Sequence, residues 1–417
     1  MRILKWLYPG MNVKRWIVLL ILGVIALVSG TVVCVRDVTR DVFPLVGSLV
    51  VFIGIALVIS GIERLIKSLT AIFRPLYQEK ELVDIVYKRR QLSKGPKLVV
   101  IGGGTGLSVL LQGLKCYTSN ITAIVTVADD GGSSGRLREQ FNILPPGDIR
   151  NCLVALADAA PLMQELFQFR FPEGTELAGH NFGNLFITAM TKLTGGFDRA
   201  IKESSKVLAI SGSVIPATLR PVTLVAEHAD GATTIGETKI SSSRRPIARL
   251  YLKPADCSPT TDVLEAIQGA EAIIFGPGSL YTSVLPNLLI RGIPEAIGAS
   301  KAIKMYICNV MTQSGETDNY TAADHLRAII EHAHAPLIEY CVVNTGAVPE
   351  EFIEKYKKEN SEPVRADIPA IEQMGVSCIA GDYISTENYV RHNSEKIAKK
   401  IISVVLESKF GKNAMYV

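Results

Sequence analysis

Two apolar runs, each ending in a glycine-rich turn, constrain the fold of this chain more than any other feature. Residues 98–101 lead into Gly-Gly-Gly-Thr-Gly at 102–106, and residues 121–128 lead into Asp-Asp-Gly-Gly-Ser-Ser-Gly at 129–135. A strand, a glycine turn, a helix and a second strand are typical of the start of an open α/β sheet, which binds ligands at the carboxyl ends of its strands. The pattern predicts a nucleotide-binding domain.

The first 62 residues hold much of the apolar character of a chain that is 48% hydrophobic. Residues 16–35 are uncharged and apolar, and residues 42–62 form a second such stretch after a short polar loop. A helix needs about 20 apolar residues to cross a bilayer. The first stretch lacks the small-residue cleavage site of a signal peptide. We predict a two-helix transmembrane hairpin over residues 1–62; the alternative is a pair of buried core helices.

Basic residues flank the hairpin at both outer ends. They are Arg2, Lys5, Lys14 and Arg15 before the first stretch, and Arg64, Lys67 and Arg74 after the second. The loop between the stretches has Arg36 and Arg40 beside two aspartates. Because lysine and arginine gather on the cytoplasmic side, both ends are expected there. The sequence thus predicts a multi-pass protein of the cell membrane with its main domain in the cytoplasm.

Residues 63–96 connect the hairpin to the rest of the chain. Apolar residues at helical spacing from Leu65 to Phe73 predict a juxtamembrane amphipathic helix. The charge-rich residues 79–97 are typical of a linker.

From residue 97 onward, short apolar runs alternate with helical patterns. Strands are predicted over 97–101, 121–128, 270–275, 304–310 and 338–344. Continuous runs of this kind favour a parallel sheet covered on both faces. Residues 218–227 and 233–240 predict an antiparallel hairpin within a β excursion of about 218–252, to which residues 249–252 add a third strand. The expected fold class is α/β, a Rossmann-like, doubly wound and mainly parallel sheet over 97–392, closed by a helix within 393–417.

Composition excludes some functions. A net charge of +4, with no basic stripe interleaved with aromatic residues, gives no support for nucleic-acid binding. The 7 cysteines contain no CxxC pair and fit a reducing compartment better than a disulfide framework.

The first glycine turn suits an anionic ligand. Gly103, Gly104, Thr105 and Gly106 offer backbone N–H groups at the start of a helix, where phosphate binds readily. A Walker A loop would end in Gly-Lys-Ser/Thr, which is missing here. The dinucleotide fingerprint would need a glycine where the chain has Leu107. A nicotinamide-dependent oxidoreductase is therefore disfavoured.

The second turn adds acidic and hydroxyl groups. Asp129 and Asp130 could bind a ribose, hold Mg²⁺ beside phosphates, or in one case cap the next helix. Ser133, Ser134 and Arg136 suit a phosphate better than a core.

A later turn, Pro-Pro-Gly-Asp-Ile-Arg-Asn at 145–151, presents Asp148 at a helix start. Asp148 is either a helix cap or, with Asp130, a candidate ligand of a divalent cation. Mg²⁺ is the only cofactor that these residues suggest.

Three further segments supply candidate ligand contacts. Gly-His-Asn-Phe-Gly-Asn at 179–184 opens a predicted helix and offers His180, the candidate base, with Asn181 and Asn184. Gly-Pro-Gly-Ser-Leu-Tyr-Thr-Ser at 276–283 follows a predicted strand. From this turn and from the end of the next strand come Gly278, Ser279, Tyr281 and Asn309. Tyr281 could stack on a base or belong to the core.

These motifs, in this order and together with Asn-Val-Met-Thr-Gln at 309–313, resemble the YvcK family, the gluconeogenesis factors. The resemblance runs from residue 97 to the C-terminal helix, and the wider superfamily includes 2-phospho-L-lactate transferases of the CofD type. It implies a Rossmann-like fold, binding of UDP-N-acetylglucosamine or a related UDP-sugar, and a part in cell shape and wall synthesis during gluconeogenic growth. The hairpin departs from the soluble pattern of many members.

Two hypotheses follow from the resemblance. The first is a non-catalytic UDP-sugar sensor at the membrane, with cell-wall synthesis proteins as partners and a homo-oligomeric assembly. The second is a Mg²⁺-dependent transferase in which Asp130 and Asp148 match the positions expected to hold the ion, and Thr105 and Tyr281 match sugar-nucleotide contacts. The sensor is preferred because His180 is the only histidine in the motifs.

Overall fold

A computed structural model describes residues 14–36, 42–70, 87–386 and 389–410. The chain divides into two compact units, residues 1–89 and residues 90–417. Each unit is considered by itself.

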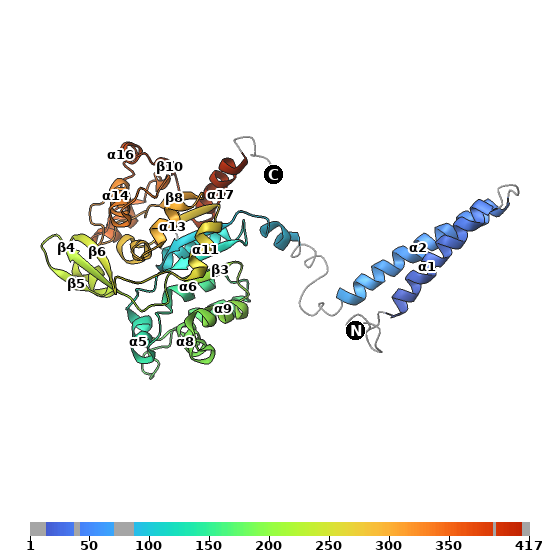
Figure 1. Ribbon diagram of the computed structural model, residues 1–417, viewed down its shortest axis with the longest axis horizontal. Coiled ribbons are helices and arrows are strands. Elements are labelled where there is room, and N and C mark those ends of the chain that lie inside the picture. The colour runs from blue at the N-terminus through green and yellow to red at the C-terminus, as the bar shows by residue number, and fades with distance from the viewer. Residues whose placement is uncertain (1–13, 37–41, 71–86, 387–388, 411–417) are drawn as a thin grey trace. The chain divides into compact units, whose positions relative to one another are not determined.

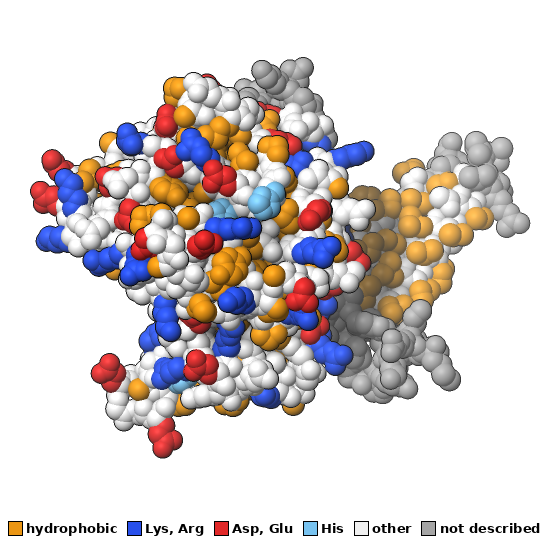
Figure 2. Space-filling model, turned by 60° about the vertical axis from the view of Figure 1, so that its left-hand side comes forward, with side chains coloured by type: hydrophobic (Ala, Val, Ile, Leu, Met, Phe, Trp, Pro, Cys, Tyr) orange, Lys and Arg blue, Asp and Glu red, His pale blue; other side chains and the backbone are white. Residues whose placement is uncertain are grey.

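The first unit is an antiparallel pair of long apolar helices, α1 (Lys14–Arg36) and α2 (Val42–Thr70) (Figure 1). Each contains a stretch that is long and apolar enough to cross a membrane, Arg15–Cys34 and Leu45–Lys67. Hydrophobic side chains cover the visible surface of the pair, whereas charged groups are scattered over the visible face of the second unit (Figure 2). The predicted juxtamembrane helix is continuous with α2 as far as Thr70, and Phe73 lies outside the described residues.

Glycines at seven-residue spacing form the seam between α1 and α2. They are Gly23 and Gly30 on α1, and Gly47, Gly54 and Gly61 on α2. A Cβ atom at Gly54 would lie 2.8 Å from the backbone N of Leu27, and one at Gly30 would lie 2.8 Å from the backbone N of Val51. The absence of side chains therefore lets the two backbones approach closely, as in small-residue packing between membrane helices.

The second unit is built on a sheet of 7 parallel strands in the order β10-β9-β8-β7-β1-β2-β3. The strands are β1 (Leu98–Gly102), β2 (Ile121–Val125), β3 (Ser213–Pro216), β7 (Ala272–Phe275), β8 (Ile303–Ile307), β9 (Tyr340–Asn344) and β10 (Ser377–Gly381). Strand order runs outward from β1 in both directions, so right-handed crossovers place helices on both faces. The predicted α/β, doubly wound fold is confirmed. Strands β3 and β10 were not predicted, because each is an edge strand with a weak and partly exposed apolar run.

Helices cover the sheet, and its central strands β1 and β7 are buried along their whole length (Figure 1). The helices are α4 (Gly104–Leu114), α5 (Gly132–Phe141), α6 (Gly147–Leu156), α7 (Pro161–Gln168), α8 (Phe182–Thr194), α9 (Phe197–Val207), α11 (Thr261–Gly269), α12 (Leu285–Leu288), α13 (Ile293–Ala299), α14 (Ala322–Ala333), α15 (Glu350–Lys357), α16 (Ile368–Gln373) and α17 (Ser394–Phe410). A π-helical turn, η2 (Leu280–Val284), precedes α12. The closing helix predicted after residue 393 is confirmed as α17.

The β excursion is a separate antiparallel sheet of β5 (Thr233–Ile235), β4 (Thr223–His228) and β6 (Ile247–Lys253). The predicted strands 218–227 and 233–240 were both too long. Pro221 has no N–H to donate to a ladder, so β4 begins after it. Gly236, at φ 103°, turns the chain out of β5 and into α10 (Glu237–Ser243). The linker prediction is also modified, because residues 87–92 are helical.

The glycine turns after β1 and β7 touch each other through their backbones. A Cβ atom at Gly106 would lie 2.6 Å from the carbonyl oxygen of Pro277, and one at Gly278 would lie 3.1 Å from that of Gly103. These strands are neighbours in the sheet but far apart in sequence, and the chain diverges from them in opposite directions. This is the switch point at which doubly wound sheets bind ligands.

We expect Gly106→Ala to lower the free energy of unfolding by about 2 kcal/mol, because the added methyl group must displace backbone rather than a flexible side chain. The control is Gly269→Ala, where a Cβ atom meets nothing within 4 Å. Calorimetry of the full chain in detergent micelles measures both variants. Equal stability of the two would contradict the close approach of the turns.

Candidate functional site

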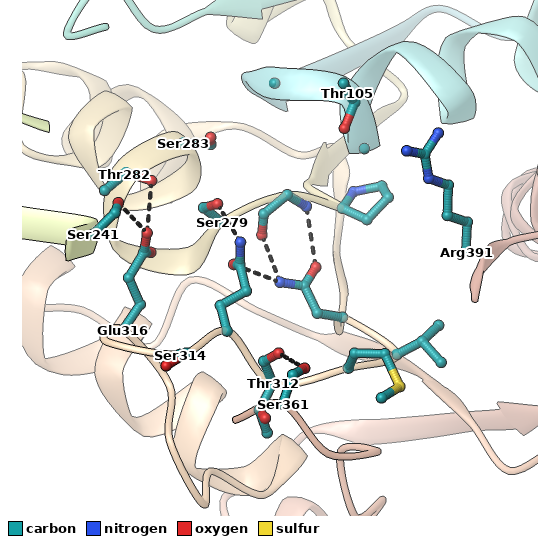
Figure 3. Close-up of a pocket in the computed structure, with 18 of the residues that line it drawn as sticks. Thr105, Ser241, Ser279, Thr282, Ser283, Thr312, Ser314, Glu316, Ser361 and Arg391 are labelled. Carbon is teal, nitrogen blue, oxygen red and sulfur yellow. Dashed lines mark hydrogen bonds between the residues drawn. The ribbon is translucent and has the colours of Figure 1, made fainter. Parts of the chain in front are cut away.

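A cavity of about 620 Å³ lies at the carboxyl ends of β1, β2, β7 and β8 (Figure 3). Its polar lining consists of Thr105, Thr126, Asp129, Asp148, Glu237, Ser241, Ser279, Thr282, Ser283, Asn309, Thr312, Gln313, Ser314, Glu316, Glu359, Ser361, Arg391 and His392. Its size is within the range of small-molecule sites.

The two glycine turns supply one wall of the cavity. Gly104 and Gly106 line it from the start of α4, and Gly278 lines it from the turn after β7. The α4 N-terminus brings backbone N–H groups and a favourable dipole to this wall, and the Gly104 N–H faces the Asp148 carboxylate. Gly103 is needed for a different reason, since a Cβ atom there would lie 2.6 Å from Oδ2 of Asp148. The turn predicted to bind an anion, residues 103–106 and called the cradle from here on, therefore borders the cavity.

Side chains after β7 and β8 are fixed to one another across the floor of the cavity (Figure 3). Asn309 donates to the carbonyl of Gly278 at 2.8 Å and accepts from its N–H at 3.2 Å. Gln313 donates to Ser279 Oγ at 2.7 Å. Predicted contacts Gly278, Ser279 and Asn309 thus lie together with Thr105, as the sequence suggested.

Two carboxylates, Asp129 and Asp148, line the cavity beside the glycine cradle. Asp129 accepts from the N–H of Gly131 at 2.9 Å, and burial raises its pKa. Burial, with the neighbouring Asp129 charge as the second cause, raises the pKa of Asp148 to about 6. Two half-buried acids that repel each other are stabilised by a cation, and Mg²⁺ is commonly held by one or two carboxylates plus phosphate oxygens. The pair therefore fits a divalent ion shared with a phosphorylated ligand.

Asp130 is not part of this pair, contrary to prediction. Its Oδ1 accepts from the N–H of Thr238 at 2.9 Å and from the Thr238 hydroxyl at 2.7 Å, so it anchors the start of α10. The candidate ligands of a divalent cation are therefore Asp129 and Asp148, and not Asp130 and Asp148 as predicted. Within the described part of the chain, no cluster of three or more His, Cys, Asp or Glu side chains could hold a metal. A bound ligand would have to complete the coordination.

The segment 179–184 was predicted to contact the ligand. It instead lies outside the cavity and supports the acidic turn at 129–135. Ser133 Oγ lies 3.1 Å from Nδ1 of His180 and accepts from the Asn181 N–H at 3.3 Å. Asn184 donates to Ser134 Oγ at 3.5 Å, and the Ser134 hydroxyl faces Asp129. All five side chains are buried. They hold the 129–135 turn in place, and His180 is not positioned as a base.

Arg136 and Tyr281 also lie outside the cavity. Arg136 donates to the carbonyl of Ala178 at 2.9 Å. Tyr281 is only 2% exposed, and its hydroxyl lies 2.8 Å from that of Tyr320. Burial raises the pKa of Tyr281 well above its usual value. Tyr281 is a core residue, which is the alternative that the sequence left open.

Several titratable cavity residues were not predicted, among them Glu237, Glu316 and Arg391. Glu237 starts α10, in a segment predicted as strand, and burial among several other acids raises its pKa to about 7. Arg391 lies in β12 (Arg391–His392), which pairs with β11 (Ile384–Ser385). Glu237 and Glu316 each follow a glycine of positive φ, Gly236 and Gly315, but neither glycine ends an apolar run that predicted a central strand. Arg391 follows no glycine turn, so only the tertiary fold reveals its place at the cavity.

Comparison with known proteins gives consistent matches. The family described as 2-phospho-L-lactate transferase CofD matches residues 98–384. A Nostoc sp. protein is 45% identical over 418 residues, covering 95% of this chain and 91% of its own length. The gluconeogenesis factor of Bacillus subtilis (strain 168) is 47% identical and covers 76% of this chain and 100% of its own length. A crystal structure from Bacillus halodurans, 50% identical, superposes with a TM-score of 0.73 over 74% of this chain and 100% of that one.

We expect Asp148→Asn to stabilise the ligand-free protein at pH 8 by about 3 kcal/mol relative to wild type. Asp148 keeps its proton to about pH 6 when folded but loses it near its ordinary pKa of 3.8 when unfolded. The folded chain thus binds more protons between these values, and its stability falls as pH rises through them. The amide of the variant does not titrate and removes this dependence, so the two proteins converge near pH 4.

Denaturant titrations from pH 4 to pH 8 test this expectation, with the exposed Glu173→Gln as control. A variant that is less stable than wild type at pH 8 would show that Asp148 is not held in an unfavourable charged state.

Proposed function

Because this chain belongs to the CofD family, among its gluconeogenesis factors, we propose that its α/β domain binds UDP-N-acetylglucosamine or a related UDP-sugar as a regulatory ligand. The observation that carries the proposal is one cavity at the switch point of the sheet, lined by both glycine turns and by groups of opposite charge. We further propose that ligand occupancy governs a role in cell shape and wall synthesis under gluconeogenic growth.

The diphosphate is assigned to the cradle at the start of α4. Thr105 and the α4 N–H groups offer donors there, and Arg391 extends toward the same region from the other side (Figure 3). Arginine matches phosphate oxygens with several donors in a fixed plane. Asp129 and Asp148 would hold a divalent cation, which when bound neutralises diphosphate charge. Without it, these carboxylates would repel the ligand.

A second candidate is a Mg²⁺-dependent transferase of the 2-phospho-L-lactate transferase type. Glu237 favours it, because a cavity carboxylate with a pKa of about 7 suits proton transfer near neutral pH. The regulatory function is preferred, since His180, the base suggested by sequence, lies outside the cavity.

The helical hairpin is proposed as a membrane anchor that keeps the domain in the cytoplasm near wall-synthesis proteins. Its exposed surface is apolar, with Phe52 at 70% exposure and Leu45 at 74%. The Bacillus subtilis relative is matched over its whole length by 76% of this chain, so about a quarter of this chain has no counterpart in it. Assembly as a homo-oligomer is also proposed from the family resemblance.

We expect the full chain in detergent micelles to bind UDP-N-acetylglucosamine with Mg²⁺, and Arg391→Ala to weaken this binding at least ten-fold, about 1.4 kcal/mol. Isothermal calorimetry measures both, with the exposed Arg291→Ala as control. No heat with any UDP-sugar would overturn the proposal. Turnover of the UDP-sugar during incubation with Mg²⁺ and a broad set of acceptors would favour the transferase instead.

Cysteine labelling tests the membrane topology. In intact spheroplasts, we expect a membrane-impermeant maleimide to label Thr39→Cys in the loop between the helices. The natural Cys116, which is exposed on the domain, should react only after lysis. Wild-type chain and the Cys116→Ser variant are the controls. Recovery of the full chain in the soluble fraction, or labelling of Cys116 before lysis, would contradict the anchor.

A further inference from the structure

The two ends of the cavity differ in charge. Arg391 lies at one end and Glu316 at the other, with Ser279 between them (Figure 3). Glu237 lines the cavity as well, and its neighbouring charges include both Asp129 and Glu316. The carboxylates thus continue from the proposed cation site toward the Glu316 end.

Glu316 is a buried carboxylate with incomplete hydrogen bonding. The residue is 5% exposed, and its Oε1 accepts from Ser241 Oγ at 2.9 Å and from Thr282 Oγ1 at 3.1 Å. The backbone N–H groups of Tyr281 and Thr282 also face the carboxylate. Its Oε2 is buried without a hydrogen bond of normal geometry. Among the described residues, no lysine, arginine or histidine forms an ion pair with it.

A buried acceptor without a donor is unfavourable, and a ligand that donates a hydrogen bond there removes the cost. A phosphate cannot do so, because Glu316 and Glu237 would repel it. A planar base is better suited to the apolar part of the wall, which Val310, Met311 and Val390 form. The Glu316 end therefore fits an uncharged group with several donors, such as a sugar.

We propose that Glu316 determines specificity for the sugar by accepting a hydrogen bond from a sugar hydroxyl or amide N–H. The hydroxyls of Ser241 and Thr282 hold Oε1, so that the carboxylate keeps acceptor capacity for a donor of the ligand at this end of the cavity. With the diphosphate on the α4 cradle, this contact fixes the direction in which the ligand lies. The inference rests on the proposed binding of a UDP-sugar and adds which residue recognises its sugar.

Calorimetry with two ligands tests this role. Full-length Glu316→Gln in detergent micelles should bind UDP-N-acetylglucosamine at least ten-fold more weakly than wild type, because the amide replaces one acceptor by a donor. Its affinity for UDP, which lacks the N-acetylglucosamine group, should change less than two-fold. The matched control is Glu354→Gln, an exposed carboxylate on α15 that does not line the cavity. It should leave both affinities unchanged.

Thermal unfolding checks that Glu316→Gln is folded. A second variant, Glu316→Asp, keeps the charge but withdraws the acceptor by one methylene. It should also weaken binding of UDP-N-acetylglucosamine and leave binding of UDP nearly unchanged. Equal losses for UDP and for UDP-N-acetylglucosamine overturn the inference and leave the proposed function standing. Failure of the wild-type chain to bind either ligand overturns both.

Discussion

The backbone contact between the turns after β1 and β7 is the constraint on which the rest of the domain depends. Any side chain at Gly106 would meet Pro277, so the turns can touch only where glycine stands. Their contact lets β1 and β7 pair as neighbours although 169 residues separate Gly102 and the start of β7 at Ala272. The cavity forms where the chain diverges from this contact. One steric requirement therefore sets both the pairing at the centre of the sheet and the position of the site.

The negative charges in the cavity destabilise the ligand-free fold and favour binding of a cation. Asp129, Asp148, Glu237 and Glu316 all have raised pKa values, with burial as the largest cause in each case. Such a cluster weakens the ligand-free protein at neutral pH. A cation shared with a phosphorylated ligand would remove much of that repulsion, so binding would also stabilise the fold. The buried network of Ser133, His180 and the two asparagines keeps the acidic turn rigid enough to maintain the cluster.

Local sequence patterns predicted the sheet centre well because buried parallel strands are continuous apolar runs followed by glycine turns. They also located Thr105, Ser279 and Asn309, which follow directly from strand ends. The errors have one physical origin: a polar or aromatic side chain near a turn can point into a cavity or into the core, and spacing does not distinguish these. Tyr281 and His180 do not line the cavity. Arg391 lines the cavity from the short hairpin of β11 and β12. Local sequence patterns cannot relate this hairpin to the glycine turns, because only the tertiary fold brings them to the same cavity.

The seven-residue glycine seam between α1 and α2 has a mechanical consequence. Each glycine faces the backbone of the opposite helix, so a shift by one turn, about 5.4 Å, would bring a larger side chain into a gap that accepts none. The two helices are locked in register and cannot slide past each other as a piston does. Movement of this unit is restricted to tilting or turning as one body, in which both helices take part equally.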